Sequence, residues 1–145
     1  MSTHSFILEP GSWLGQGTIS FSESSDQLKF YTRWKVSKSK AQLINCFQEI
    51  EIEGIGEKME NTFILSDLSP INFHIKLENH LLGSVDGKGV IDEKLIAWEF
   101  RDPGTTGFEG YEVYELQPDG SYLMRAEYAS SDQMRTIVQG KIWRS

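Results

Sequence analysis

The side chains best suited to hold a small molecule are phenols and guanidinium groups within alternating stretches of the sequence. Tyr31 and Arg33 are two residues apart, which places them on one face of a β-strand. Because a guanidinium group binds anions through two parallel hydrogen bonds, this pair could hold the carboxylate of a ligand. The alternative is that both residues face water, with Phe30 and Trp34 facing inward.

Three polar residues in the second half of the chain are further candidates for orienting a ligand, namely Tyr114, Arg125 and Tyr128. Arg125 and Tyr128 are three positions apart, so a regular strand places them on opposite faces. They therefore do not form a clamp by themselves. We expect one or two of these three residues, or of the earlier pair, to orient a bound molecule.

The spacing of reactive side chains does not assemble a catalytic or metal-binding constellation. The only cysteine is Cys46, and neither His74 nor His80 has an acidic residue or a second histidine at ligand spacing. We therefore predict no catalytic residue, no metal site and no cofactor. The pattern favours a binding protein, although a tyrosine or histidine in a cavity could still serve an enzyme as an acid–base group.

The elements that position these side chains are predicted to be β-strands, because apolar and polar residues alternate along most of the chain. Phe30, Thr32 and Trp34 alternate with charged or polar neighbours, and the stretches 71–78 and 95–101 repeat the pattern. Turn signals such as Asp119-Gly120 separate the runs. The predicted strands are 12–22, 28–37, 42–53, 58–66, 71–79, 81–91, 94–101, 109–117, 120–130 and 134–143.

The connections between these strands predict how the strands pair. All are short except 102–110, and short links join antiparallel neighbours. A meander of this length removes its two unpaired edges by closing on itself. We therefore predict that residues 1–145 form one all-β domain, an antiparallel up-and-down β-barrel of about ten strands with little or no helix.

One face of the predicted strands carries apolar and aromatic residues that we expect to point inward. They are Phe30, Trp34, Phe73, Ile75, Trp98, Phe100, Tyr122 and Met124. These residues would either line a ligand cavity or fill a packed core, because ten strands leave more interior space than small barrels do. The alternation alone leaves both possibilities open.

Composition limits the partners and the compartment. A net charge of −7 and a pI near 4.9 argue against nucleic acid and anionic membrane surfaces, both of which require a basic face. The first eight residues lack the basic region of a signal peptide, and no apolar run approaches the ~18 residues of a spanning helix. A single cysteine excludes an intramolecular disulfide. These features predict a cytoplasmic protein.

Short motifs at the two ends of the chain resemble those of a known superfamily. They comprise Gly11, Trp13, Gly15 and Gly17 near the first predicted strand, with Lys141 and Arg144 near the last. A Gly-x-Trp opening with a late cation resembles the signature of the calycins, which include lipocalins, fatty-acid-binding proteins and avidins. The fuller opening is most similar to that of nitrobindin-type ten-stranded barrels. If the first and last strands pair, Lys141 or Arg144 can lie over the Trp13 indole.

Two family features do not carry over to this sequence. Nitrobindin-like proteins hold haem iron through a late histidine, whereas the histidines here are His4, His74 and His80. Fatty-acid-binding proteins hold a carboxylate with a late Arg-x-Tyr pair, which the spacing of Arg125 and Tyr128 does not reproduce. The resemblance therefore predicts neither haem nor this carboxylate clamp.

The resemblance and the alternation together predict a binding protein. We expect non-covalent binding of a small, largely apolar ligand, fatty-acid-like or a similar metabolite, in the barrel interior. One alternative is an enzyme that uses the same cavity. Another is a packed barrel that serves as a protein-interaction module or homodimer without a ligand. The protein is expected to be a monomer or a homodimer.

Overall fold

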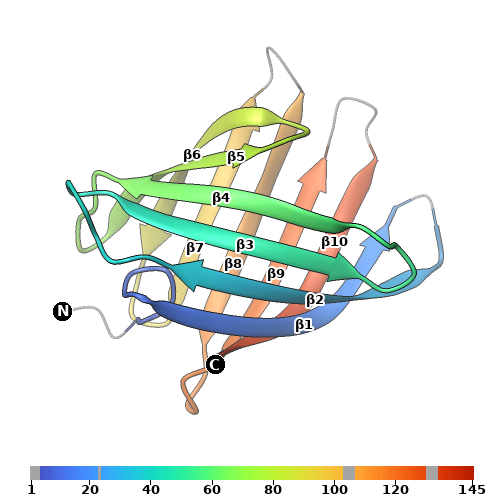
Figure 1. Cartoon of the computed structure of the whole chain (residues 1–145), viewed down its shortest axis with the longest axis horizontal. Coiled ribbons are helices and arrows are strands. Elements are labelled where there is room, and N and C mark those ends of the chain that lie inside the picture. The colour runs from blue at the N-terminus through green and yellow to red at the C-terminus, as the bar shows by residue number, and fades with distance from the viewer. Residues whose placement is uncertain (1–3, 23, 103–106, 130–133) are drawn as a thin grey trace.

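The computed structural model describes residues 4–22, 24–102, 107–129 and 134–145, and these form one closed antiparallel barrel (Figure 1). The ten strands are β1 (Gly11–Phe21), β2 (Gln27–Val36), β3 (Ile44–Ile52), β4 (Lys58–Ser66), β5 (Asn72–Asn79), β6 (Gly83–Ile91), β7 (Leu95–Asp102), β8 (Phe108–Leu116), β9 (Tyr122–Ala129) and β10 (Arg135–Arg144). Each strand pairs with its neighbours in sequence, and β10 returns to pair with β1.

The predicted fold class is confirmed. Every predicted strand boundary lies within two residues of the observed one, and the described residues contain no helix. Within that part of the chain there is accordingly no helix long and apolar enough to cross a membrane. The alternation was informative because each strand has one face toward the interior and one toward water.

The barrel closes along a seam of nine residue pairs, from Trp13 opposite Arg144 to Phe21 opposite Thr136. At its centre Gly17 lies opposite Gly140. A Cβ atom on Gly17 would lie 2.0 Å from the carbonyl oxygen of Gln139, which is far inside van der Waals contact. Glycine is therefore needed here because the two backbones approach too closely for any side chain.

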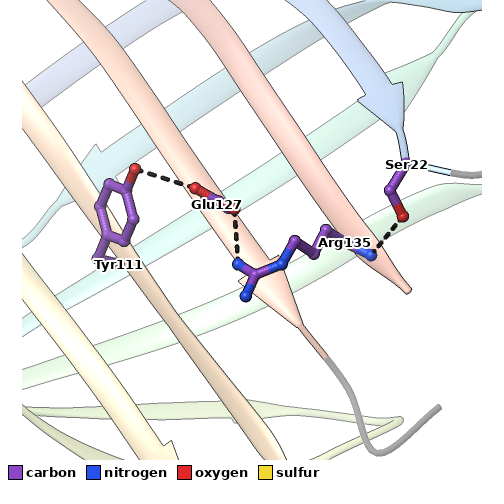
Figure 2. Close-up of polar contacts among 4 residues, drawn as sticks. All are labelled: Ser22, Tyr111, Glu127 and Arg135. Carbon is purple, nitrogen blue, oxygen red and sulfur yellow. Dashed lines mark hydrogen bonds and ion pairs between the residues drawn. The ribbon is translucent and has the colours of Figure 1, made fainter. Parts of the chain in front are cut away.

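A polar network reinforces the far end of the seam on the outer face (Figure 2). The backbone N–H of Arg135 donates to the Ser22 hydroxyl at 3.0 Å, and its guanidinium group donates to Glu127 at 2.7 Å. Tyr111 donates to the second oxygen of Glu127 at 3.2 Å. The network links β8, β9 and β10 to the end of β1. Because the Arg135 side chain is about half exposed, we expect the ion pair to contribute no more than about 1 kcal/mol.

The end of the barrel where β1 begins is sealed by residues 4–10, which we call the N-terminal plug. Figure 1 shows this segment in blue beside the N label, curling at the end of the barrel. Phe6 and Ile7 are fully buried. The Phe6 ring centre lies 5.4 Å from that of Trp13, 5.2 Å from Trp34 and 4.7 Å from Tyr114. This plug was not predicted from the sequence.

Hydrogen bonds anchor the plug to one strand and one turn of the barrel. His4 Nδ1 lies 2.8 Å from the Tyr122 hydroxyl, and Nε2 lies 2.6 Å from the Asp92 carbonyl oxygen. Since a carbonyl oxygen only accepts, Nε2 carries a proton and donates it to Asp92, while Nδ1 is hydrogen-bonded to the Tyr122 hydroxyl. The imidazole therefore ties the plug to both β9 and the β6–β7 turn.

Of Lys141 and Arg144, the two cations predicted to lie over the Trp13 indole, it is Arg144 that does so. The guanidinium carbon lies 5.9 Å from the centre of the indole, and Nη2 donates to the Pro10 carbonyl oxygen at 3.1 Å. Lys141 instead forms an ion pair with Asp119 at 3.6 Å. Arg144 thus covers Trp13 and holds the entry of the plug into β1.

The plug makes a specific prediction for stability. Replacing Phe6 with alanine removes a buried ring that contacts four aromatic residues, and the resulting cavity should lower the free energy of unfolding by about 3–5 kcal/mol. Urea denaturation measures this change. The control is Ile71→Ala, because that side chain is 67% exposed and its loss should change stability by less than about 0.5 kcal/mol. Equal effects of the two substitutions would show that the plug is not part of the folded core.

Candidate functional site: an apolar cavity with a buried carboxyl group

The half of the barrel away from the plug contains a cavity of about 380 Å³. Most of its wall is apolar, with Ile19, Phe30, Ile52, Leu82, Phe108 and Val138 among the lining residues. Leu81 and Met59 also line it and are 83% and 43% exposed, so they mark its mouth. The volume falls within the range of small-molecule sites, roughly 300–1,000 Å³.

A glutamate lies in the wall of this cavity. Glu112 is 3% exposed and accepts hydrogen bonds from three neutral donors. Tyr114 donates its hydroxyl to Oε1 at 2.6 Å, and the Trp98 indole donates to Oε2 at 3.1 Å. Tyr128 supplies the third side-chain hydrogen bond. We call these four residues the carboxyl cluster.

The register of β7, β8 and β9 brings the carboxyl cluster together. Glu112 lies directly opposite Trp98 on β7, and the inward alternation of β8 places Tyr114 on the same face. Tyr128 on β9 lies opposite Gly110. A Cβ atom on Gly110 would lie 2.4 Å from Cδ1 of the Tyr128 ring. Glycine at position 110 therefore leaves the space in which the Tyr128 ring lies beside Glu112.

Burial determines the protonation behaviour of the carboxyl cluster. Loss of solvation raises the pKa of Glu112, and the hydrogen bonds from Tyr114, Tyr128 and Trp98 only partly oppose this rise. Burial and the nearby carboxyl group also raise the pKa of Tyr114 and of Tyr128 well above the ordinary phenol value. Both phenols therefore remain protonated donors across the physiological pH range.

The cavity wall made by β2, β3, β4 and β5 carries a row of neutral polar side chains, which we call the amide row. Asn79 donates to Asn61 at 3.1 Å, Asn61 to Gln48 at 3.0 Å and Gln48 to Thr32 at 3.1 Å. Thr32 in turn donates to the Glu49 carbonyl oxygen. In the strand order β3 is five strands from β8 in either direction, so Gln48 and Glu112 lie on opposite walls.

Two buried indole groups have no hydrogen-bond acceptor among the described residues, namely Trp13 Nε1 and Trp34 Nε1. Trp34 also lines the cavity. A buried donor that lacks an acceptor is uncommon in folded proteins. Both indole nitrogens are thus enclosed by the packed core, and Trp34 contributes to the cavity wall as an apolar ring.

The structure buries all eight residues that the alternation placed inward: Phe30, Trp34, Phe73, Ile75, Trp98, Phe100, Tyr122 and Met124. Of these, Phe30, Trp34 and Met124 line the cavity. The rest pack around it, as Trp98 does by stacking on Tyr114 with ring centres 5.0 Å apart.

The five polar candidates divide between the two faces of the barrel. Tyr114 and Tyr128 line the cavity. Tyr31 and Arg33 lie on the exposed face of β2, and Tyr31 is half exposed. Arg125 is exposed on β9. The outward orientation of Tyr31 and Arg33 follows from the alternation, because Phe30, Thr32 and Trp34 occupy the inward positions.

Sequence reasoning missed Glu112 and the amide row. Alternation places Glu112 on the same face of β8 as Phe108 and Tyr114, whereas Glu109 and Glu115 lie on the other face. The pattern of this strand therefore favours burial of the Glu112 face. A glutamate among apolar and aromatic residues on one face was the available signal, but it does not identify the partners of the carboxyl group.

The described residues offer little metal or thiol chemistry. No group of three or more histidine, cysteine, aspartate or glutamate residues among them is placed to hold a metal ion. Burial raises the pKa of the Cys46 thiol to about 12, so the reactive thiolate is scarce at neutral pH. Comparison with protein-family models and with curated proteins finds no match to this chain.

The raised pKa of Glu112 predicts a pH dependence of stability. In the unfolded chain Glu112 titrates near its ordinary value of 4.5, whereas in the folded protein it keeps its proton to higher pH. Above about pH 4.5 the unfolded state thus binds fewer protons, and this group lowers the free energy of unfolding until the folded-state pKa is passed. Below pH 4.5 the group has no such effect.

Urea denaturation between pH 4 and pH 8 measures this contribution. The substitution Glu112→Gln should remove the decline that the wild-type protein shows above pH 4.5. Glu115→Gln, which removes the same charge from an exposed position on the same strand, should retain the decline. A Glu112→Gln curve parallel to that of the wild type would contradict the raised pKa.

Proposed function

We propose that this protein is a calycin-like barrel that binds a small, largely apolar molecule, fatty-acid-like or a similar metabolite, non-covalently in its interior. The observation that carries the proposal is the cavity of about 380 Å³ between the N-terminal plug and the open end. A core selected only for stability is packed to high density and leaves few voids larger than a water molecule. The cavity is much larger than such a void.

The composition of the wall supports this proposal. Ligand sites are commonly apolar with a few polar groups that orient the ligand. Here the apolar lining contributes affinity through burial of the ligand surface. Glu112 and the amide row supply the polar groups. The proposed location is the cytoplasm, where the single buried thiol of Cys46 would stay reduced.

The carboxyl cluster also favours a second candidate, an enzyme that uses the same cavity. A carboxyl group with a raised pKa beside two phenols has the properties of a general acid or base. The binding protein remains the first proposal because all of these groups are already hydrogen-bonded to one another. Native mass spectrometry of protein purified from cells would distinguish the candidates, since a binding protein retains a ligand whose mass stays constant during incubation.

Blocking the cavity provides a direct test of the binding proposal. The uncharged dye N-phenyl-1-naphthylamine should bind the wild-type protein with increased fluorescence. Val138→Trp places a large ring in the cavity wall and should weaken dye binding at least tenfold. Val90→Trp is the matched control, because Val90 is 59% exposed on the outer face of β6, and it should bind the dye like the wild type. Absence of dye binding to the wild type, or equal binding by both variants, would contradict an internal site.

A further inference from the structure

We infer that the ligand of this cavity carries a positively charged nitrogen, as in an alkylamine, which pairs with the carboxylate of Glu112. This inference rests on the proposed function and specifies the class of molecule bound. It keeps the small, largely apolar ligand of the proposed function, but it replaces the anionic head group of a fatty-acid-like molecule with a cation.

The carboxyl group of Glu112 is surrounded by hydrogen-bond donors. Trp98, Tyr114 and Tyr128 are all hydrogen-bond donors toward Glu112. An ionised carboxylate has about four acceptor sites, so three donors leave one site for a further donor. Because Glu112 lines the cavity, a bound molecule can supply that donor.

The described part of the cavity wall provides no positive charge to balance an ionised Glu112. The described residues that line the cavity include no lysine, arginine or histidine, and the described core contains none apart from His4 in the plug. A buried carboxylate without a cation is unfavourable. A ligand ammonium group would provide the counter-charge in a site of low dielectric, where the attraction is strong.

The same charge distribution disfavours an anionic ligand. A carboxylate in the cavity would find neutral donors in the amide row, but no cation among the described lining residues. It would also be repelled by an ionised Glu112. An apolar amine avoids this cost because its chain contacts the apolar wall while its nitrogen lies at the carboxyl cluster.

The titratable groups facing Glu112 are few, which makes its ionisation measurable. On its own strand the facing group is Tyr114, and on β9 it is Tyr128. The β7 strand presents the neutral Trp98, and the opposite wall presents the neutral amide row. Among the described residues, the cavity lining includes no other carboxyl group and no histidine that would titrate alongside Glu112.

Proton release follows from this arrangement. Burial raises the pKa of Glu112 in the free protein, so a fraction of the molecules carries a proton on this group. An ammonium ion binds the ionised form and therefore drives this proton off. A primary alkylamine itself stays protonated at these pH values, since the comparable lysine side chain has a pKa of about 10.4. Amine binding should thus release up to one proton and become tighter as the pH rises.

The experiment is isothermal titration calorimetry with octylamine, octanol and octanoate, which share a chain length and differ only in the head group. At pH 7 the wild-type protein should bind octylamine at least tenfold more tightly than octanol, and octanoate least tightly. Glu112→Gln should remove the preference for octylamine and change octanol binding less than threefold. Glu115→Gln keeps Glu112 but loses the same charge, and it should retain the preference.

A second measurement tests the inference even if Glu112→Gln does not fold. Titration of the wild type in buffers of different ionisation enthalpy reports proton release, which should accompany octylamine but not octanol. Equal binding of octanol and octylamine without proton release would overturn the inference while leaving the proposed function intact. Tightest binding of octanoate would also overturn it. If none of the three compounds bound, the proposed function and the inference would fail together.

Discussion

The pairing of β1 with β10 is the constraint on which the rest of the structure depends. Ten successive hairpins would otherwise form an open ribbon with two unpaired edges and no enclosed interior. The seam of nine residue pairs closes the sheet. Alternate residues of each strand then point either into the enclosed interior or toward the solvent. Close backbone contact at Gly17 and Gly140, and the covering of Trp13 by Arg144, show how specific residues at the seam permit closure.

Closure creates a tube, and the N-terminal plug makes its two ends different. At the plug end, Phe6 completes an aromatic cluster with Trp13, Trp34, Tyr114 and Tyr122. At the other end the interior stays hollow, and its wall carries the buried carboxyl of Glu112. Tyr114 connects the two ends, because its ring packs against Phe6 and its hydroxyl donates to Glu112. The aromatic packing at the plug end thus helps to position the hydrogen-bond donor of the buried carboxyl group.

Much of this architecture could be predicted because the alternation of apolar and polar residues along a strand indicates which side chains are buried. The strand limits, the meander and the burial of residues such as Trp98 and Ile75 all follow from it. The candidate site could not be predicted as well, since it depends on which strands lie next to one another in register. Glu112 accepts hydrogen bonds from Trp98 and Tyr128 on neighbouring strands. No local sequence pattern predicts that these three side chains lie together. The plug was missed because it belongs to no strand and is ordered by contacts with distant residues.

Amide hydrogen exchange along the seam tests the closed barrel most directly. If β1 and β10 are paired, amides of Trp13–Phe21 and 136–144 that donate across the seam should exchange as slowly as those between β8 and β9 in the same barrel. Fast exchange confined to the seam-facing amides of β1 and β10, with protection elsewhere, would show two free edges. That result would contradict the closed barrel and the enclosed cavity derived from it.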